Sequence, residues 1–239
     1  MPVQAMTDCR IWIDAYDLSS TTNDMAAGIE VAELETTNFD SGGWRQRIGG
    51  LRDVTYDVKG MLDFADDASE EALNAVLGAS GKVVTFAVDS AVGSVCVFGR
   101  GLGTSFGQMA KVGDLAMFAG QVKGSNAASM VEGQVLRAKA STSAASGNGS
   151  SVQQGAIAST ETGYAALHVF SASGNLVVKV ESDSATGFPS TTDRITFTTA
   201  SGPGAQFGSV AGPVTDDWWR ISWTLSAGSA SFAVVFGIS

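Results

Sequence analysis

Histidine and cysteine are nearly missing from this chain of 239 residues, which has one histidine, His168, and two cysteines, Cys9 and Cys96. These are too few for a disulfide framework or for a zinc site built from nitrogen and sulfur ligands. A Ser-His-Asp hydrolase would have to use His168 as its base, yet His168 stands in the strand-like alternation Ala166, His168, Phe170. No Gly-x-Ser-x-Gly surrounds any serine either. We therefore expect a structural histidine, two reduced thiols, no cofactor, no metal site and no enzyme.

Long apolar runs and basic charge are also scarce. No run approaches the about 18 residues that a membrane-spanning helix needs, and residues 1–25 lack a basic segment followed by an apolar one. We expect neither membrane insertion nor an export signal. The 14 lysines and arginines are outnumbered by 24 aspartates and glutamates, which gives a net charge of -10. A protein that grips nucleic acid through its phosphates would have the opposite balance, so specific DNA binding is not expected.

Glycine is abundant, with 29 residues, and serine and threonine accompany it, a composition typical of β-structure with many turns. From Ala138 to Gln154 the chain is small and polar, AKASTSAASGNGSSVQQ, and cannot bury enough apolar surface to offset its ordering entropy. We therefore expect two domains, 1–139 and 156–239, joined by a flexible linker over 140–155. The alternative is a single domain with a long surface loop.

The first domain is predicted to be α+β and mostly β. Val54, Tyr56, Val58, Leu62 and Phe64 share one face of a strand over residues 54–64, and polar side chains share the other. A helix of about ten residues is expected to begin at the capping residue Asp67 and to end at Gly78. Further strands are expected at 10–18, 82–89, 94–98 and 115–123.

Two motifs resemble ligand sites, but each has a simpler explanation. The segment Gly99–Gly107 contains Gly-x-Gly but lacks the Lys-Ser/Thr of a phosphate-binding loop, so we expect a flexible turn between strands. The carboxylates of Asp63, Asp66 and Asp67 could hold a divalent cation. Helix capping and the positive end of the helix dipole account for them without a metal.

The stretch Ser19–Arg52 is too long for an ordinary loop between two strands. Part of it, Ile29–Leu34, alternates as a strand does. We expect an extended hairpin that packs on another subunit, because Trp44, Ile48 and Leu51 need apolar surface to cover them.

The second domain is predicted to be a small antiparallel β-sandwich. Alternation within 218–226 assigns Trp219, Ile221, Trp223 and Leu225 to the core. Trp218 lies on the other face, where it is the candidate for stacking on a sugar ring or, alternatively, a partly covered rim residue. Strands are expected at 164–170, 175–182, 194–199, 218–226 and 231–238.

Residues 44–60, WRQRIGGLRDVTYDVKG, resemble a segment of the tail tube proteins of siphophages, bacteriophages with long non-contractile tails. In that family a long loop with aromatic and charged residues leads into a Gly-Leu-basic-Asp turn and a strand of polar alternation. The order of elements is similar too, and the second domain resembles the C-terminal domains that decorate some tubes. The resemblance implies a tail-tube-like β-sandwich or barrel with one flanking helix and a long hairpin loop. An immunoglobulin-like or jelly-roll-like β-sandwich would follow it.

The resemblance also implies a structural virion protein. Six subunits would form a ring, and stacked rings would form a tail tube, assembled in the host cytoplasm, with an acidic channel for DNA ejection. The partners would be further copies, the tape measure, tail terminator and distal tail proteins, DNA in unspecific transit, and host surface glycans. The loop would hold rings together through Trp44, Arg45, Arg47, Ile48, Leu51 and Arg52.

The channel lining would come from the polar face of the strand over 54–64. Its candidate residues are Thr55, Asp57, Lys59 and Asp63, and we expect Lys59 to pair with a carboxylate on the neighbouring strand. Two other functions compete with the tube. One is a carbohydrate-binding β-sandwich module, and the other is a tail terminator or distal tail protein, which forms single rings rather than polymers.

Overall fold

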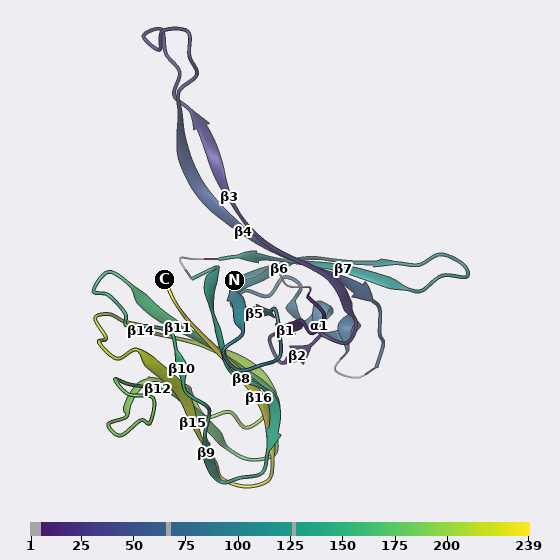
Figure 1. Ribbon diagram of the computed structural model, residues 1–239. Helices are drawn as coiled ribbons and strands as arrows, with labels where there is room; N and C mark the ends of the chain where they lie inside the picture. Colours follow the sequence, from purple (N-terminus) through teal and green to yellow (C-terminus); the bar gives the residue numbers. More distant parts are fainter. Residues whose placement is uncertain (1–5, 66–67, 126–127) are drawn as a thin grey trace.

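The computed structural model describes residues 6–65, 68–125 and 128–239, and it is almost entirely antiparallel β-structure (Figure 1). The predicted mostly-β fold is confirmed. In chain order the elements are β1 (Arg10–Ile13), β2 (Tyr16–Asp17), β3 (Thr22–Glu35), β4 (Arg47–Met61), α1 (Ser69–Val76), β5 (Lys82–Ala87), β6 (Val95–Met109), β7 (Met117–Gly124), β8 (Val131–Thr142), β9 (Ser146–Asn148), β10 (Val152–Gln153), β11 (Thr162–Ala172), β12 (Leu176–Asp183), β13 (Thr192–Thr196), β14 (Gly204–Ala211), β15 (Trp218–Leu225) and β16 (Ala230–Ile238).

The helix α1 forms close to its predicted place. Asp66 and Asp67 lie outside the described residues, so the capping and cation hypotheses for them are not addressed; Ala68 occupies the N-cap position. Leu73 and Val76 bury the apolar stripe of the helix against the sheet. Gly78, with a φ of 72°, follows the helix end in the left-handed conformation that glycine adopts without strain.

Strand β6 joins two parts of an eleven-stranded sheet. Its first half pairs with β8 and β5, and its second half, Gly101–Met109, pairs with β7. The prediction of a flexible turn at Gly99–Gly107 is therefore wrong. The glycines serve close approach instead: a Cβ on Gly99 would lie 2.0 Å from the Ser129 carbonyl oxygen, and one on Gly103 would lie 2.2 Å from the Val76 carbonyl oxygen.

Beyond β7 the sheet continues through β4 to β3, which gives a four-stranded antiparallel layer in the order β3-β4-β7-β6. The predicted buried face of β4 is confirmed for Val54, Tyr56 and Val58. They pack with α1 and with β1 and β5 in one hydrophobic cluster. The prediction is wrong for Phe64, which is 69% exposed, because β4 ends at Met61 and both Leu62 and Phe64 lie beyond it. The other face of this layer carries polar side chains such as Asp57 and Lys59 of β4, and a row of three methionines, Met61, Met117 and Met109, at one end.

The second half of the chain forms a sandwich. A five-stranded sheet of β9, β10, β12, β13 and β15 packs on β11, β16 and β8. The predicted core face of β15 is confirmed, because its alternate apolar side chains are buried and the Trp219 ring stacks on Phe236 at 4.3 Å between centroids. Strand β14 has no counterpart in the expected set, since its half-exposed Gly-Ala-Gln-Phe-Gly-Ser sequence has weak alternation.

Residues 140–155 carry strands rather than the expected flexible linker. The end of β8 pairs with β16, and both β9 and β10 pair with β15. Small side chains are required here, because a Cβ on Gly147 would lie 2.3 Å from the Trp223 ring. Composition alone underestimated the backbone hydrogen bonds that this stretch makes.

The proposed boundary at residue 139 falls inside β8, which pairs with β6 on one side and β16 on the other. A further cluster packs Trp12, Val83 and Phe98 against Ala166 and Val235. Strands β11 and β16 are thus covered on both faces. Independent folding of the two halves remains a prediction.

Candidate assembly surfaces

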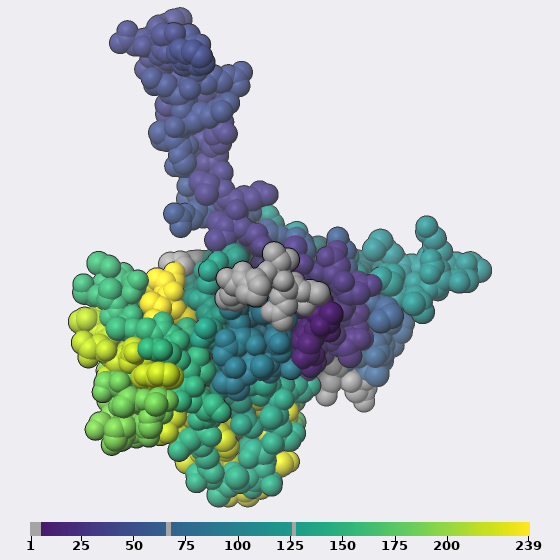
Figure 2. All heavy atoms as spheres, viewed as in Figure 1, coloured from purple at the N-terminus to yellow at the C-terminus, as the bar shows by residue number. Residues whose placement is uncertain are grey.

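The β3–β4 hairpin extends from the body of the molecule as a long arm (Figures 1 and 2). The predicted extended hairpin is confirmed. Register pairs run from Thr22↔Gly60 at the base to Glu35↔Arg47 near the tip, with irregularities that bend the ribbon. Such a two-stranded ribbon has few neighbours of its own chain beyond the base, so its outer part presents both faces to the surroundings.

The arm carries large apolar side chains in the open. Trp44 is 80% exposed, Leu51 85% and Ile48 56%, and Ile29, Val31 and Leu34 on β3 are each about half exposed. Ile48 stands directly opposite Leu34. Burial of one such side chain contributes about 1.5–3 kcal/mol, so a partner that covered the arm would be bound strongly.

The arginines of the arm lie among these apolar groups. Arg47 forms an ion pair with Glu33 across the hairpin, and Arg45 and Arg52 are exposed. The sequence-predicted stacking residues therefore lie on one protruding element, as expected. Their contact with another subunit remains a prediction.

The outer face of the β3-β4-β7-β6 layer is a network of polar pairs. Lys59 pairs with Asp24 on β3 at 3.3 Å, which confirms the predicted partner on the neighbouring strand. The Asp57 carboxylate accepts a hydrogen bond of 2.9 Å from Gln121, and Lys123 pairs with Asp53 at 3.0 Å. With Glu30 opposite Asp53, this face has four carboxylates, Asp24, Glu30, Asp53 and Asp57, against two lysines, Lys59 and Lys123.

The other two candidate lining residues differ in position. Thr55 lies on β4 between Asp53 and Asp57, directly opposite Lys123 of β7. Asp63 lies beyond the end of β4, and its carboxylate accepts a hydrogen bond from the backbone N–H of Ala65 at 3.0 Å. The structure therefore groups Thr55, Asp57 and Lys59 and places Asp63 in the turn that follows.

The layer has an unpaired edge at each side. Strand β3 pairs with β4 alone, and Thr104–Met109 of β6 pair with β7 alone among the described residues. Where this open part of β6 begins, a single bridge from Leu77 to Gly103 covers the strand. Sequence reasoning missed the β6 edge because the glycines of 99–107 indicated a turn.

His168 and one of the two cysteines, Cys96, lie in the packed interior. His168 is fully buried, with Nε2 2.8 Å from Thr85 Oγ1 and Nδ1 2.7 Å from the Asp14 carbonyl oxygen; burial lowers its pKa to about 4. Cys96 is buried as well, and burial raises the pKa of its thiol. Across 6–65, 68–125 and 128–239, no three metal-ligating side chains gather, and no helix is long and apolar enough to cross a membrane.

The candidate glycan contact, Trp218, is half-buried at the start of β15, on the face opposite the sandwich core. It stands across from Gln153 and Asp183 on the neighbouring strands. Arg220, next on the same face, lies 4.2 Å from the centroid of the Phe188 ring and bonds to Glu181 at 3.0 Å. Sugar binding by Trp218 remains a prediction.

No protein-family model and no curated protein matches this chain. Among solved structures it is similar to the tail of the empty gene transfer agent particle refined with C6 symmetry, at 17% identity and a TM-score of 0.39, over 48% of this chain and 90% of that one. It is similar to a chain of the native gene transfer agent virion at 18% identity and a TM-score of 0.43, over 54% and 98% of the two chains. The Dit protein of phage SPP1 is similar at 12% identity and a TM-score of 0.35, over 98% and 100%. TM-scores below 0.5 do not establish a shared fold or function.

Proposed function

We propose that this chain is a structural subunit of a siphophage tail that assembles with copies of itself into rings and stacks the rings into a tube. The observation that carries the proposal is the β3-β4-β7-β6 layer, whose edges, β3 and Thr104–Met109 of β6, pair on one side only among the described residues. Unpaired edges are templates for pairing with another chain. A sheet with one open edge on each side can be completed by head-to-tail association.

The strand directions suit such a joint. Successive strands of the layer are antiparallel, so β6 runs opposite to β3, and a neighbouring β6 placed beside β3 continues the alternation. Six copies with four strands each would close a barrel of about 24 strands. At about 4.8 Å per strand and a tilt of about 40°, its diameter between backbones is about 48 Å. Side chains would leave a bore wider than a DNA duplex of about 20 Å.

The charge of the layer suits a channel for DNA. Its outer face has four carboxylates and two lysines, and both lysines are paired with carboxylates, Lys59 with Asp24 and Lys123 with Asp53. The whole chain has a net charge of -10. A basic wall would retain DNA by counterion release, whereas an acidic wall repels the phosphates and lets the duplex slide. Thr55, Asp57 and Lys59 would then line the bore, with Asp63 near its rim.

The hairpin arm would connect successive rings. Trp44, Ile48 and Leu51 would be buried on the adjacent ring, and Arg45, Arg47 and Arg52 would meet its acidic surface. The sequence resemblance further suggests the tape measure, tail terminator and distal tail proteins as partners, and a place in the virion after assembly in the host cytoplasm. Trp218 would be available for host glycans on the outside.

Electron microscopy and sedimentation velocity of the purified protein test this proposal. Straight hollow cylinders with sixfold end views are the expected result at high protein concentration. Single closed rings that never stack would assign the chain to the terminator or distal tail class instead. A protein that stays monomeric when concentrated, and also beside its virion components, would overturn self-assembly altogether.

A further inference from the structure

Among the residues that the structure describes, an open trough lies between the inner face of β3 and the strands β5 and β6 of the body. Its inner part is an apolar cavity of about 210 Å³ lined by Met6, Met25, Ala27, Phe86, Val88, Val95, Cys96 and Val97. A second cavity of about 390 Å³ adjoins it and is more polar, lined by Met6, Cys9, Ile11 and Met25 together with Thr7, Ser19, Thr22, Asn23 and Asp24. Met25 lines both cavities, so they form one continuous depression along the base of β3.

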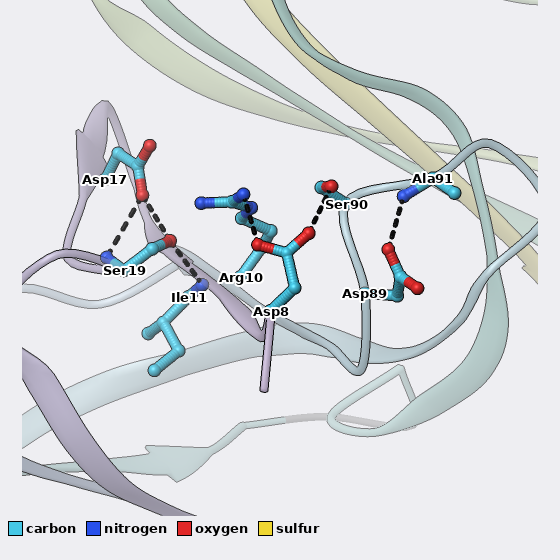
Figure 3. Close-up of polar contacts among 8 residues, drawn as sticks. All are labelled: Asp8, Arg10, Ile11, Asp17, Ser19, Asp89, Ser90 and Ala91. Atoms are coloured by element: carbon cyan, nitrogen blue, oxygen red, sulfur yellow. Dashed lines mark hydrogen bonds and ion pairs between the residues drawn. The ribbon is translucent and has the colours of Figure 1, made fainter. Parts of the chain in front are cut away.

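Polar contacts hold the N-terminal wall of this trough in place (Figure 3). The Asp8 carboxylate accepts a hydrogen bond from Ser90 at 2.5 Å and pairs with Arg10 at 2.5 Å. The Ile11 backbone N–H donates to Ser19 Oγ at 3.0 Å, and Ser19 Oγ donates to Asp17 at 2.5 Å. These contacts fix the course of residues 8–19 along this wall of the trough.

A row of residues paired across the four strands of the layer runs from the trough at β3 to the opposite edge at β6. Met25 stands opposite Val58, Val58 opposite Gly120, and Gly120 opposite Phe106. Met25 and Phe106 each pack partly against the same buried cluster, so both lie on the inner face. Phe106 is half-buried at the open edge, and Leu77 beside that edge is 46% exposed.

We propose that the trough is filled by a second copy of this chain, whose β6 edge places Phe106 and Leu77 against Met25, Ala27 and Val97. This inference rests on the proposed function and adds to it the contact that seals the ring. Successive side chains of a strand point to opposite faces of the sheet. When two strands join edge to edge, their inner side chains therefore meet only if the register shift between the strands is an even number of residues. An unshifted joint would put the neighbour's Phe106 directly opposite Met25.

A second copy fits better than an unrelated partner for two reasons. The trough and the Phe106 edge lie at opposite sides of one layer, so every copy offers one of each and the joint repeats around a ring. The chain's own β6 cannot fill the trough, because β4 and β7 lie between the two edges. Each copy would thereby complete the hydrophobic core of the next.

Cys9 reports on coverage of the outer cavity, since it lines that cavity and is half-exposed, whereas Cys96 lines the inner cavity and is buried. The protein is alkylated with N-ethylmaleimide in its assembled state and, separately, in its dissociated state. Peptide mapping then gives the reaction rate of each thiol. We expect Cys9 to react at least about tenfold more slowly in the assembled protein. Assemblies in which Cys9 reacts as fast as in the monomer would overturn this inference and leave self-assembly standing. A chain that never assembles, or that protects Cys9 only with an added tail protein, would overturn it as well.

Adjacent alanines on β3 provide a matched pair of variants. Ala27 lies opposite Tyr56 on the inner face and lines the trough, whereas Ala26 lies opposite Asp57 on the outer face. We expect Ala27→Glu to remain monomeric with a circular dichroism spectrum like that of the wild type, and Ala26→Glu to assemble. Assembly of Ala27→Glu with normal Cys9 protection would contradict the inference. If Ala27→Glu does not fold, the Cys9 rates in the wild-type protein decide alone.

Discussion

The Nε2 atom of His168 lies 2.8 Å from the hydroxyl oxygen of Thr85, and its Nδ1 atom lies 2.7 Å from the carbonyl oxygen of Asp14. A carbonyl oxygen only accepts hydrogen bonds, so Nδ1 carries the proton of the neutral ring and Nε2 accepts from the Thr85 hydroxyl. His168 belongs to β11, Thr85 to β5, and Asp14 follows β1. The neutral imidazole therefore ties the two halves of the chain together inside the core.

The first prediction follows from this burial. Burial lowers the pKa of His168 from 6.5 to about 4, so the unfolded chain binds a proton that the folded chain does not in that range. Stability is lost as the pH falls through this window. By about pH 4 the loss from this residue reaches about 3 kcal/mol. Urea denaturation at a series of pH values measures it.

The variant His168→Gln separates this effect from the titration of carboxylates. It is expected to be less stable than the wild type at neutral pH by about 1–3 kcal/mol, because one buried hydrogen bond is lost or strained. Between about pH 6.5 and 4 its stability should fall less steeply than that of the wild type. Parallel curves for the two proteins would mean that His168 is protonated in the folded state or is not buried.

The second prediction concerns the glycines of β6. A Cβ on Gly99 would lie 2.0 Å from the backbone oxygen of Ser129, whereas one on Gly107 would have its nearest atom, the Ala119 oxygen, at 3.9 Å. Gly99→Ala should lower the free energy of unfolding by at least about 2 kcal/mol, since backbone must move. Gly107→Ala, in the same segment, should change it by less than about 1 kcal/mol. Equal effects in thermal melts would indicate that 99–107 is a flexible turn after all.

These two glycines also illustrate what the sequence could and could not predict. Alternation identified the buried faces of β4 and β15, because one-sided burial leaves a period of two in the apolar residues. The glycines of 99–107 and the small residues of 140–155 carry no such period. Backbone atoms or a tryptophan ring from elsewhere in the chain closely approach Gly99, Gly103 and Gly147, although not Gly107, and that information is not local.

The candidate assembly surfaces divide in the same way. The sequence predicts that the single chain exposes Trp44, Ile48 and Leu51. They stand in a stretch that is too long for an ordinary loop, and its apolar side chains need the surface of another subunit to cover them. The role of β6 as the opposite edge of the layer could not be predicted from the sequence, because the order of strands in a sheet depends on the topology of the whole fold. The row from Met25 to Phe106 needs three register relations that join four strands.

The third prediction tests the arm. Trp44→Ala should leave the subunit folded, with a melting temperature within about 2 °C of the wild type, because the 80% exposed indole touches little of its own chain. The variant would lose about 2 kcal/mol of association free energy at each contact between rings, which would weaken the association of rings at least about tenfold. Sedimentation velocity and negative-stain microscopy over a concentration series give the result. Asp40→Ala, at the same tip, is the control and should assemble normally; tubes from Trp44→Ala at wild-type concentrations would contradict a stacking role.

The fourth prediction tests the acidic channel. Glu30→Lys together with Asp57→Lys exchanges two carboxylates of the outer face for two lysines and so reverses its charge balance. Assemblies of this variant should retain a short DNA duplex at low salt and release it as salt rises, because neutralised phosphates shed counterions. Wild-type assemblies should retain none in a co-sedimentation assay. Asp193→Lys with Glu161→Lys makes the same change in net charge away from the layer, and it should behave as the wild type does. If this control retains DNA as strongly as the first variant, net charge and not the face of β3-β4-β7-β6 governs the interaction, and the channel assignment fails.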